Sequence, residues 1–215
     1  MTLYSESAAR ADACAGMGTA EEQVARLLEA ARRREAQIAE PCRLDTVPLT
    51  KLIGYVIDKH HVYARRQVAV IRALLASLSE AQAESDTGLS RVRDLFRNLR
   101  QELLFHMEKE EVSIFPRIIR AETEVGPRER QAPPEQDPMW DAVGMLLHEH
   151  DELCGLLDEM RAATNDYTPP SGGSEHHRAL YQALRELEAD LLEHIHLEDS
   201  RLFPRALGRQ SHGRA

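Results

Sequence analysis

The chain has 215 residues, with 27 Lys and Arg against 36 Asp and Glu, which gives a formal charge of −9. This length suits one ordinary domain with an appendage. The acidic balance and the lack of a sustained basic cluster exclude non-specific binding to nucleic acid or to an anionic membrane surface. No apolar run approaches the roughly 20 residues that a membrane span needs, so we expect no membrane partner.

The cysteines and the start of the chain indicate the compartment. Cys14, Cys42 and Cys154 are odd in number and scattered, which argues against a disulfide framework and for a reducing environment. The first ten residues contain Glu6 and no apolar segment after a basic flank, so we expect no secretory signal. Together these features predict a cytoplasmic protein.

Composition predicts an all-α fold. Aromatic residues make up 5% of the chain, and Ala, Leu, Glu and Arg dominate, which favours helix. No convincing alternation of apolar and polar residues indicates a strand. We expect an up-down-up-down four-helix bundle over residues 46–210, preceded by an extension over residues 1–45.

The extension carries one helix signal. Residues 1 to about 18 show no strong pattern and are expected to fray. Thr19-Ala-Glu-Glu22 reads as a capping box, and apolar residues follow it at helical spacing to about Ile38. Pro41 ends this short helix, and residues 40–48 form a connector.

The first half of the bundle reads as a helical hairpin. Apolar residues recur at intervals of three and four from about 48 to 79, as on the core-facing side of a helix. A loop is predicted at 85–88, and a second apolar seam runs over 92–114. The polar, proline-rich stretch 122–138 is predicted to link this hairpin to the next.

The second half repeats this organisation. Its third helix carries an apolar seam over 143–160, and a turn follows at 167–173. The fourth helix carries its seam over 180–198, and Phe203-Pro204 is predicted to close it. The tail beyond Gly208 has no pattern and is expected to be disordered.

One motif occurs twice in the chain. The two copies are His106-Met-Glu-Lys-Glu110 and His194-Ile-His-Leu-Glu198. Each is followed by a charged residue, two further residues, an apolar residue and Phe-Pro. Residues four apart lie on the same face of a helix, one turn apart. Each copy therefore presents an imidazole and a carboxylate side by side, on the seam that otherwise carries leucine.

Two further histidines complete the pattern. His61 precedes His106 by 45 residues and His150 precedes His194 by 44, so the halves are offset by 89 and 88 residues. A single histidine on an apolar seam is more often a hydrogen-bonded core residue than a ligand. Carboxylates buried without a cation would, however, cost several kcal/mol, which favours a metal site over a satisfied polar core. The predicted metal ligands are His61, His106, Glu110, His150, His194 and Glu198.

The type of ligand narrows the choice of metal. Imidazole and carboxylate without thiolate suit iron, manganese or zinc, and helical bundles build dinuclear iron or manganese sites from Glu and His. Spacing does not separate iron from manganese. If both glutamates bridge, each metal has two imidazoles and two carboxylate oxygens. Octahedral iron then keeps positions for an oxo or hydroxo bridge and a small diatomic ligand.

The remaining polar residues near the motifs receive lesser roles. His60 borders the seam and is a candidate for contact with the ligands, whereas His148 is expected at the surface. Glu111 and Asp199 are expected to face solvent or to contact the ligands. His196 lies on another side of its helix, Cys154 is expected to be an inert buried thiol, and Tyr55 and Tyr63 are packing residues. The last three histidines, expected in a turn or the tail, are His176, His177 and His212.

Over about residues 48–208 the chain resembles the hemerythrin-like superfamily, and more closely its branch of repair-of-iron-centres (RIC) di-iron proteins. Nitric-oxide-binding members associated with denitrification are a close comparison. The pieces that carry the resemblance are Leu52-Ile53, His60-His61-Val-Tyr-Ala-Arg65, His106 to Glu110 with Phe115-Pro116, Met145-Leu-Leu-His-Glu-His150-Asp, Asn165-Asp-Tyr-Thr-Pro-Pro170, and His194 to Glu198 with Leu202-Phe-Pro-Arg205.

This resemblance implies a non-haem centre of two iron ions, oxo- or hydroxo-bridged, in a cytoplasmic protein of the nitrosative and oxidative stress response. His61, His106, His150 and His194 would be terminal ligands. Glu110 and Glu198 would bridge the two ions. The implied role is the repair of damaged iron–sulfur proteins, the binding of nitric oxide, or both. Whether the centre also reduces nitric oxide as an enzyme stays open.

The chain departs from the resemblance in its thiols. Many relatives begin with an adjacent Cys-Cys pair, where the nearest residue here is the lone Cys14, and often carry Cys after the Pro-Pro turn, where this chain has Gly172-Gly173-Ser174. Nitric oxide binding needs none of these thiols. A reversible oxygen-binding or oxygen-sensing protein is the alternative, favoured if His60 or His148 is a fifth imidazole ligand. An iron storage or delivery protein with a labile site is the third.

Overall fold

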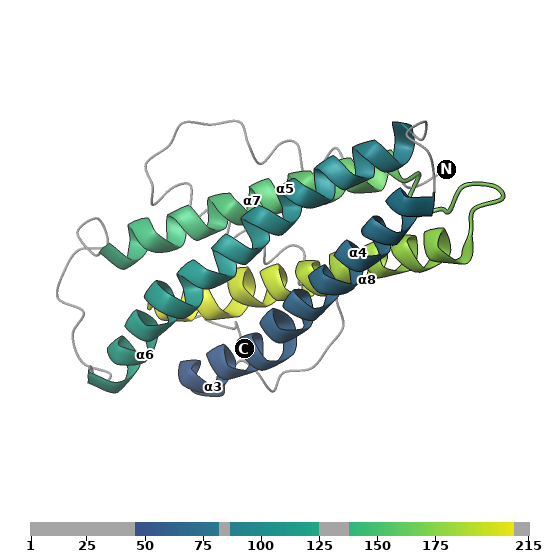
Figure 1. Ribbon diagram of the computed structural model, residues 1–215. Coiled ribbons are helices and arrows are strands. Elements are labelled where there is room, and N and C mark those ends of the chain that lie inside the picture. Colours follow the sequence, from purple (N-terminus) through teal and green to yellow (C-terminus); the bar gives the residue numbers. More distant parts are fainter. Residues whose placement is uncertain (1–45, 82–86, 125–137, 209–215) are drawn as a thin grey trace, which may run out of the picture.

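The computed structural model describes residues 46–81, 87–124 and 138–208, and every regular element in them is helical. The helical segments join into four long rods. Figure 1 shows α4 (Val62–Ala81) lying along α8 (Glu175–Leu197) and α5 (Thr87–Lys109) lying along α7 (Pro138–Ala163). The predicted all-α four-helix bundle is therefore confirmed. The four rods are α3 (Leu49–Tyr55), η2 (Val56–His61) and α4 (Val62–Ala81); α5 (Thr87–Lys109), η3 (Glu110–Ile114) and α6 (Phe115–Glu124); α7 (Pro138–Ala163); and α8 (Glu175–Leu197), η5 (Glu198–Leu202) and α9 (Phe203–Ala206).

Two apolar clusters fill the bundle. One gathers side chains such as Leu103, Leu153 and Leu187, and the other includes Phe115 and Phe203. Each large apolar side chain buried in this way contributes about 1.5–3 kcal/mol. Along each rod, the motif histidines and glutamates fall between residues of the first cluster and residues of the second. The bundle thus contains a polar layer with an apolar core on either side.

Three of the four rods contain a π-helical stretch, and each stretch begins or ends at a motif residue. His61 is the last residue of η2, Glu110 the first of η3, and Glu198 the first of η5. A π-helical turn holds an extra residue, so successive side chains are turned through a smaller angle than in an α-helix. Neighbouring residues can then face the same side. Such turns are frequent at functional sites.

Several predicted helix boundaries were wrong. Thr87 and Gly88 belong to α5 rather than to a loop, and residues 122–124 continue α6 rather than the linker. Pro138 is the first residue of α7, where its fixed φ suits a first helical turn. The fourth rod begins at Glu175, because the Ser174 hydroxyl accepts a hydrogen bond from the backbone N–H of His177.

Parts of the predictions lie outside the described residues. These are the helix expected over residues 19–38, the centre of the linker and the tail after Gly208. The division into 1–45 and 46–210 stays a prediction. Among the described helices, none combines the length and apolar character needed to cross a bilayer.

The turn between α7 and α8 has an unusual backbone. Asn165, Asp166 and Tyr167 have φ values of 48°, 55° and 54°, in the left-handed region that L residues rarely occupy. The Thr164 hydroxyl stabilises them by accepting a hydrogen bond from the Tyr167 N–H (3.1 Å) and donating one to the Met160 carbonyl (2.8 Å). A turn was predicted here, but at 167–173, and its first residues lie earlier.

The first rod begins with a cap supplied by a distant residue. Pro48 precedes α3 and offers no side-chain acceptor. The Glu122 carboxylate of α6 instead accepts hydrogen bonds from the backbone N–H groups of Leu49 (2.6 Å) and Thr50 (2.9 Å) and from the Thr50 hydroxyl (2.7 Å). This carboxylate therefore joins the start of the first rod to the end of the second.

We expect Glu122→Ala to lower the free energy of unfolding by about 1 kcal/mol, the usual contribution of a helix cap. Burial raises the pKa of Glu122, but the hydrogen bonds from Thr50 and Leu49 outweigh it and leave the pKa below 4.5. Because the folded-state pKa is lowered, this stabilisation is present above about pH 4.5 and is lost as the pH falls through the folded value. Urea unfolding at neutral and at acid pH would measure it. Glu108→Ala, at an exposed glutamate on α5, is the control, and an equal effect from both variants would contradict the cap.

Candidate metal centre

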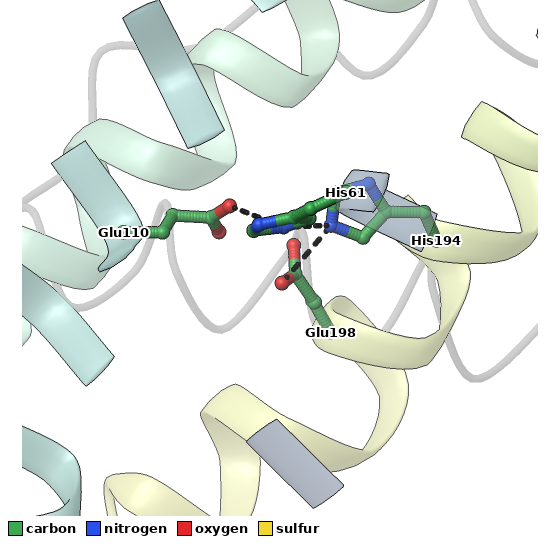
Figure 2. Close-up of side chains that lie close together, drawn as sticks. All are labelled: His61, Glu110, His194 and Glu198. Atoms are coloured by element: carbon green, nitrogen blue, oxygen red, sulfur yellow. Dashed lines mark hydrogen bonds and ion pairs between the residues drawn. The ribbon is translucent and has the colours of Figure 1, made fainter. Parts of the chain in front are cut away.

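The structure brings all six predicted ligand residues together in the polar layer. Each is at most 2% exposed. They form two groups of four, and the ligand atoms within each group lie within 4.8 Å of one another. Figure 2 shows the first group, with Glu110 and the two imidazoles approaching from different rods. The groups are His61, Glu110, His194 and Glu198, and His106, Glu110, His150 and Glu198.

The two glutamates belong to both groups. Glu110 places Oε2 3.3 Å from Nε2 of His61 and Oε1 3.4 Å from Nε2 of His106. Glu198 places Oε1 3.2 Å from Nε2 of His194 and Oε2 3.3 Å from Nε2 of His150. Each carboxylate therefore directs one oxygen at each group, which is the arrangement that a bridging carboxylate requires.

The four imidazoles and the two carboxylates together form a closed ring of six side chains. The Nε2 atoms of His61 and His194 are 3.3 Å apart, and those of His106 and His150 are 3.0 Å apart. Four nitrogens and four carboxylate oxygens thus converge in the centre of the bundle. They come from η2, α5, η3, α7, α8 and η5.

Carboxylates outside the ring fix three of the histidines. Nδ1 of His61 lies 2.6 Å from Oε1 of Glu111, and Nδ1 of His150 lies 2.7 Å from Oδ1 of Asp199. Glu111 and Asp199 directly follow the two ring glutamates, within η3 and η5. Both had been expected to face solvent or the ligands, and contact with the ligands is what the structure shows.

The third carboxylate is Glu149 of α7, directly before His150. Its Oε2 lies 2.9 Å from Nδ1 of His106, and its Oε1 contacts Lys109. Glu111 is paired in the same way with Arg65, at 2.9 Å. Two of the three outer carboxylates are therefore themselves paired with partly exposed cations.

These outer bonds determine which nitrogen of each imidazole faces the ring. An ionised carboxylate only accepts hydrogen bonds, so Nδ1 of each bonded histidine carries the proton. The neutral form of that histidine then presents a bare Nε2 lone pair to the ring. In His106 and His150 two such lone pairs would face each other at 3.0 Å, which is unfavourable unless a cation lies between them.

In the metal-free protein, protons supply part of this positive charge. Burial lowers the pKa of His106, but the charge and close contact of Glu110 and the hydrogen bond to Glu149 outweigh it and raise the pKa to about 9. Burial also lowers the pKa of His150, which Asp199 and Glu198 raise well above its usual value.

The ring glutamates respond in the opposite sense. Burial raises the pKa of Glu110, but the charge of His106 and the close contacts of the carboxylate with His106 and His61 hold that pKa well below its usual range. Burial and the neighbouring charge of Glu110 raise the pKa of Glu198, yet His194 and His150 bring it below its ordinary value. Both glutamates therefore remain carboxylates.

The ring fits a pair of cations. All four carboxylate oxygens of Glu110 and Glu198 are buried and accept no hydrogen bond among the described residues. Their contacts with the imidazoles are ion pairs, and a buried carboxylate without a compensating charge costs several kcal/mol. Imidazole nitrogen with carboxylate oxygen is the donor set that iron, manganese and zinc accept.

Comparison with known proteins identifies the domain. Residues 52–206 match the family described as the Hemerythrin HHE cation binding domain. The chain belongs to this family.

The hemerythrin relatives place the chain on one branch of the family. It is 36% identical over 162 residues to the iron-sulfur cluster repair protein YtfE of Edwardsiella ictaluri, a match that covers 75% of this chain and 67% of that protein. It is 33% identical over 160 residues to the YtfE protein of Yersinia pestis, over 74% of this chain and 66% of the relative. The chain therefore spans about two thirds of the relatives' length. Its resemblance to the RIC branch is confirmed.

The other histidines of this hemerythrin domain divide clearly. His148 is exposed, as predicted, and its Nε2 lies 3.6 Å from Oε1 of Glu152. His176 and His177 were wrongly placed in a turn, since both lie in the first turn of α8, where His177 is buried. His60 is fully buried and packs against the ring histidine His194.

Two residues around the ring were missed by sequence reasoning. Glu149 bonds to His106, and Asp190 lies 3.0 Å from Nδ1 of His60. Both contacts join different rods of the bundle, so helical spacing within one rod does not reveal them. The 89-residue offset of the two halves could have drawn attention to Glu149, because this residue precedes His150 as His60 precedes His61.

We expect the metal-free protein to become less stable as the pH rises from about 6.5 to about 9. Because the folded-state pKa of His106 is raised from 6.5 to about 9, its contribution is complete below the unfolded value and lost as the pH passes the folded one. A shift of this size corresponds to about 3 kcal/mol. Denaturant unfolding across this range would measure the loss, and His106→Gln should make it smaller. A flat profile in the unmodified chain would contradict the expected charge on His106.

Proposed function

We propose that the ring holds two iron ions, with His61 and His194 as terminal ligands of one and His106 and His150 as terminal ligands of the other. Glu110 and Glu198 bridge the two ions in this proposal. Support comes from the division of the carboxylate oxygens, since each glutamate directs one oxygen at each group. The family name, a cation-binding domain, supports a metal of this kind.

We propose further that this di-iron protein acts in the response to nitrosative and oxidative stress, by repairing damaged iron–sulfur clusters and by binding nitric oxide. The closed ring of four imidazoles and two carboxylates is the observation that carries this proposal. The names of the relatives support the repair role, with iron–sulfur proteins as partners. When bound, the two irons would supply redox chemistry and open positions for a small diatomic ligand.

The residues around the ring have separable tasks in this proposal. The imidazoles bind, and the outer carboxylates Glu111, Glu149 and Asp199 orient them and increase their basicity. The apolar clusters on both sides exclude water, so that charges in the polar layer interact strongly. Both nitric oxide and oxygen are small enough and apolar enough to enter such an interior.

The proposal gives no task to a thiol. Cys154 is half-buried against the apolar cluster that contains Leu153, and Cys14 and Cys42 lie outside the described residues. Binding of nitric oxide by iron needs no cysteine, so this role is compatible with the chain as it stands. The cytoplasmic location belongs to the proposal in the same way, as an expectation from the scattered cysteines.

The oxygen-binding alternative receives no specific support. It would be favoured by a fifth imidazole ligand from His60 or His148. His148 lies at the surface, and His60 belongs to neither group of converging ligand atoms. Oxygen binding is therefore an outcome of the experiment below rather than a second proposal.

We expect Glu110→Ala and Glu198→Ala each to lower bound iron well below two per chain, because each substitution removes one oxygen ligand from both irons. Metal analysis of the purified variants would measure the content. His176→Ala, at an exposed histidine of α8, is the control and should keep full iron. Full occupancy in both glutamate variants would rule out the bridging assignment.

Anaerobic titration of the reduced, iron-loaded protein with nitric oxide tests the second part of the proposal. We expect saturable changes in absorbance and in paramagnetic resonance, because the ring leaves positions on each iron free of protein ligands. The matched titration uses oxygen. A stable, reversible oxygen adduct together with no response to nitric oxide would replace the proposed function by oxygen binding.

A further inference from the structure

The two halves of the chain support their ring histidines by corresponding residues. Glu111 bonds to Nδ1 of His61, and Asp199, 88 residues later, bonds to Nδ1 of His150. In both halves, the residue after the bridging glutamate thus holds the histidine contributed by the other rod of that hairpin. For two of the four ring histidines, the residue that holds Nδ1 therefore follows the internal repeat.

The third support predicts where the fourth should be. Glu149, directly before His150, bonds to Nδ1 of His106. By the internal repeat, this pair corresponds to His60, directly before His61, and His194 of the second half. A residue at position 60 should therefore hold His194, but the chain has a histidine there where the other half has a carboxylate.

The structure places His60 in this position. Its ring lies parallel to that of His194, with an interplanar angle of 9° and 5.5 Å between ring centroids. Nδ1 of His60 lies 3.0 Å from Oδ1 of Asp190, which precedes His194 by one turn of α8. The ring of Tyr55 meets His60 edge-on at 5.9 Å. His60 is held on one edge and presents a flat face to His194.

The burial of His60 indicates that its position matters. The side chain is fully buried, yet its Nε2 has no hydrogen-bond partner among the described residues. Such a buried, unpaired atom lowers stability compared with a paired one. Leucine or phenylalanine would fill this space without that cost, but neither could bond to Asp190.

We propose that His60, fixed by Asp190, is the positioning residue for His194, and does by ring stacking what Glu149 does for His106 by a direct hydrogen bond. This role rests on the proposed metal centre, because an imidazole held in one plane binds a metal more tightly than a mobile one. His60 itself is not a ligand in this arrangement. Its contribution passes through the orientation of the His194 ring.

The test compares two substitutions at position 60. His60→Ala removes the stacking face, whereas His60→Gln supplies a side-chain oxygen that can accept a hydrogen bond from His194 Nδ1, as Glu149 does from His106. We expect His60→Ala to release iron to a chelator about 10–100-fold faster than the unmodified chain and to change the spectrum of the iron centre. We expect His60→Gln to restore most of the retention.

Matched variants calibrate the result. Glu149→Ala removes the corresponding support of His106 and should have an effect similar to His60→Ala, while His148→Ala, at the exposed neighbour on α7, should have none. Unchanged iron release in His60→Ala, or equal damage from the Ala and Gln variants, would overturn the positioning role. Circular dichroism and thermal unfolding of the metal-free variants identify those that fail to fold, and His60→Gln then carries the test.

A measurement without metal separates this inference from the proposed function. Nitrogen-15 magnetic resonance of the metal-free protein reports the mobility of each imidazole. We expect His60→Ala to increase the mobility of the His194 ring and to leave that of His106 unchanged. If the unmodified chain takes up no iron, the proposed function fails while this readout still decides the stacking role. Equal mobility of His194 in both proteins would overturn it.

Discussion

The burial of two carboxylates among four imidazoles is the constraint on which the rest of this bundle depends. Glu110 and Glu198 are fully buried and keep their charge, since the histidines around them lower their pKa values. Such a layer can persist only if positive charge compensates it and if the apolar side chains on either side stabilise the fold independently. The two apolar clusters meet the second condition, and protons or metal ions meet the first. Protons and metal compete for the same Nε2 atoms, so metal affinity and histidine charge are linked.

The backbone is adapted to this layer. Three rods interrupt their α-helical hydrogen bonding at His61, Glu110 and Glu198. The π-helical turns after the two glutamates allow consecutive residues to act on the same imidazoles. Glu110 faces Nε2 of His61 while Glu111 bonds to its Nδ1. The stretch η3 thereby contributes both Glu110, which belongs to the ring of six side chains, and Glu111, which orients His61. An uninterrupted α-helix would turn these neighbours further apart.

Sequence reasoning predicted the ring but not everything that supports it. The pair His106 and Glu110, repeated in the second half, is fixed by helical periodicity, which also predicts the bundle. The contact of Glu149 with His106 depends on how two rods pack, and no spacing within a rod encodes it. Helix ends were also poorly predicted. Pro138 was read as linker although proline suits a first turn, and the Ser174 cap at the start of α8 was overlooked.

The internal repeat makes the departures from symmetry informative. Three ring histidines bond through Nδ1 to carboxylates outside the ring. His194 instead stacks against the imidazole of His60, whose Nδ1 faces Asp190. A carboxylate bonded to Nδ1 increases the electron density that Nε2 offers a metal, and a stacked ring fixes orientation without doing so. The group containing His106 and His150 thus has two strengthened donors, and the group containing His61 and His194 has one. Two metal ions held by the same residue types would therefore occupy unequal positions, and the inequality originates at position 60.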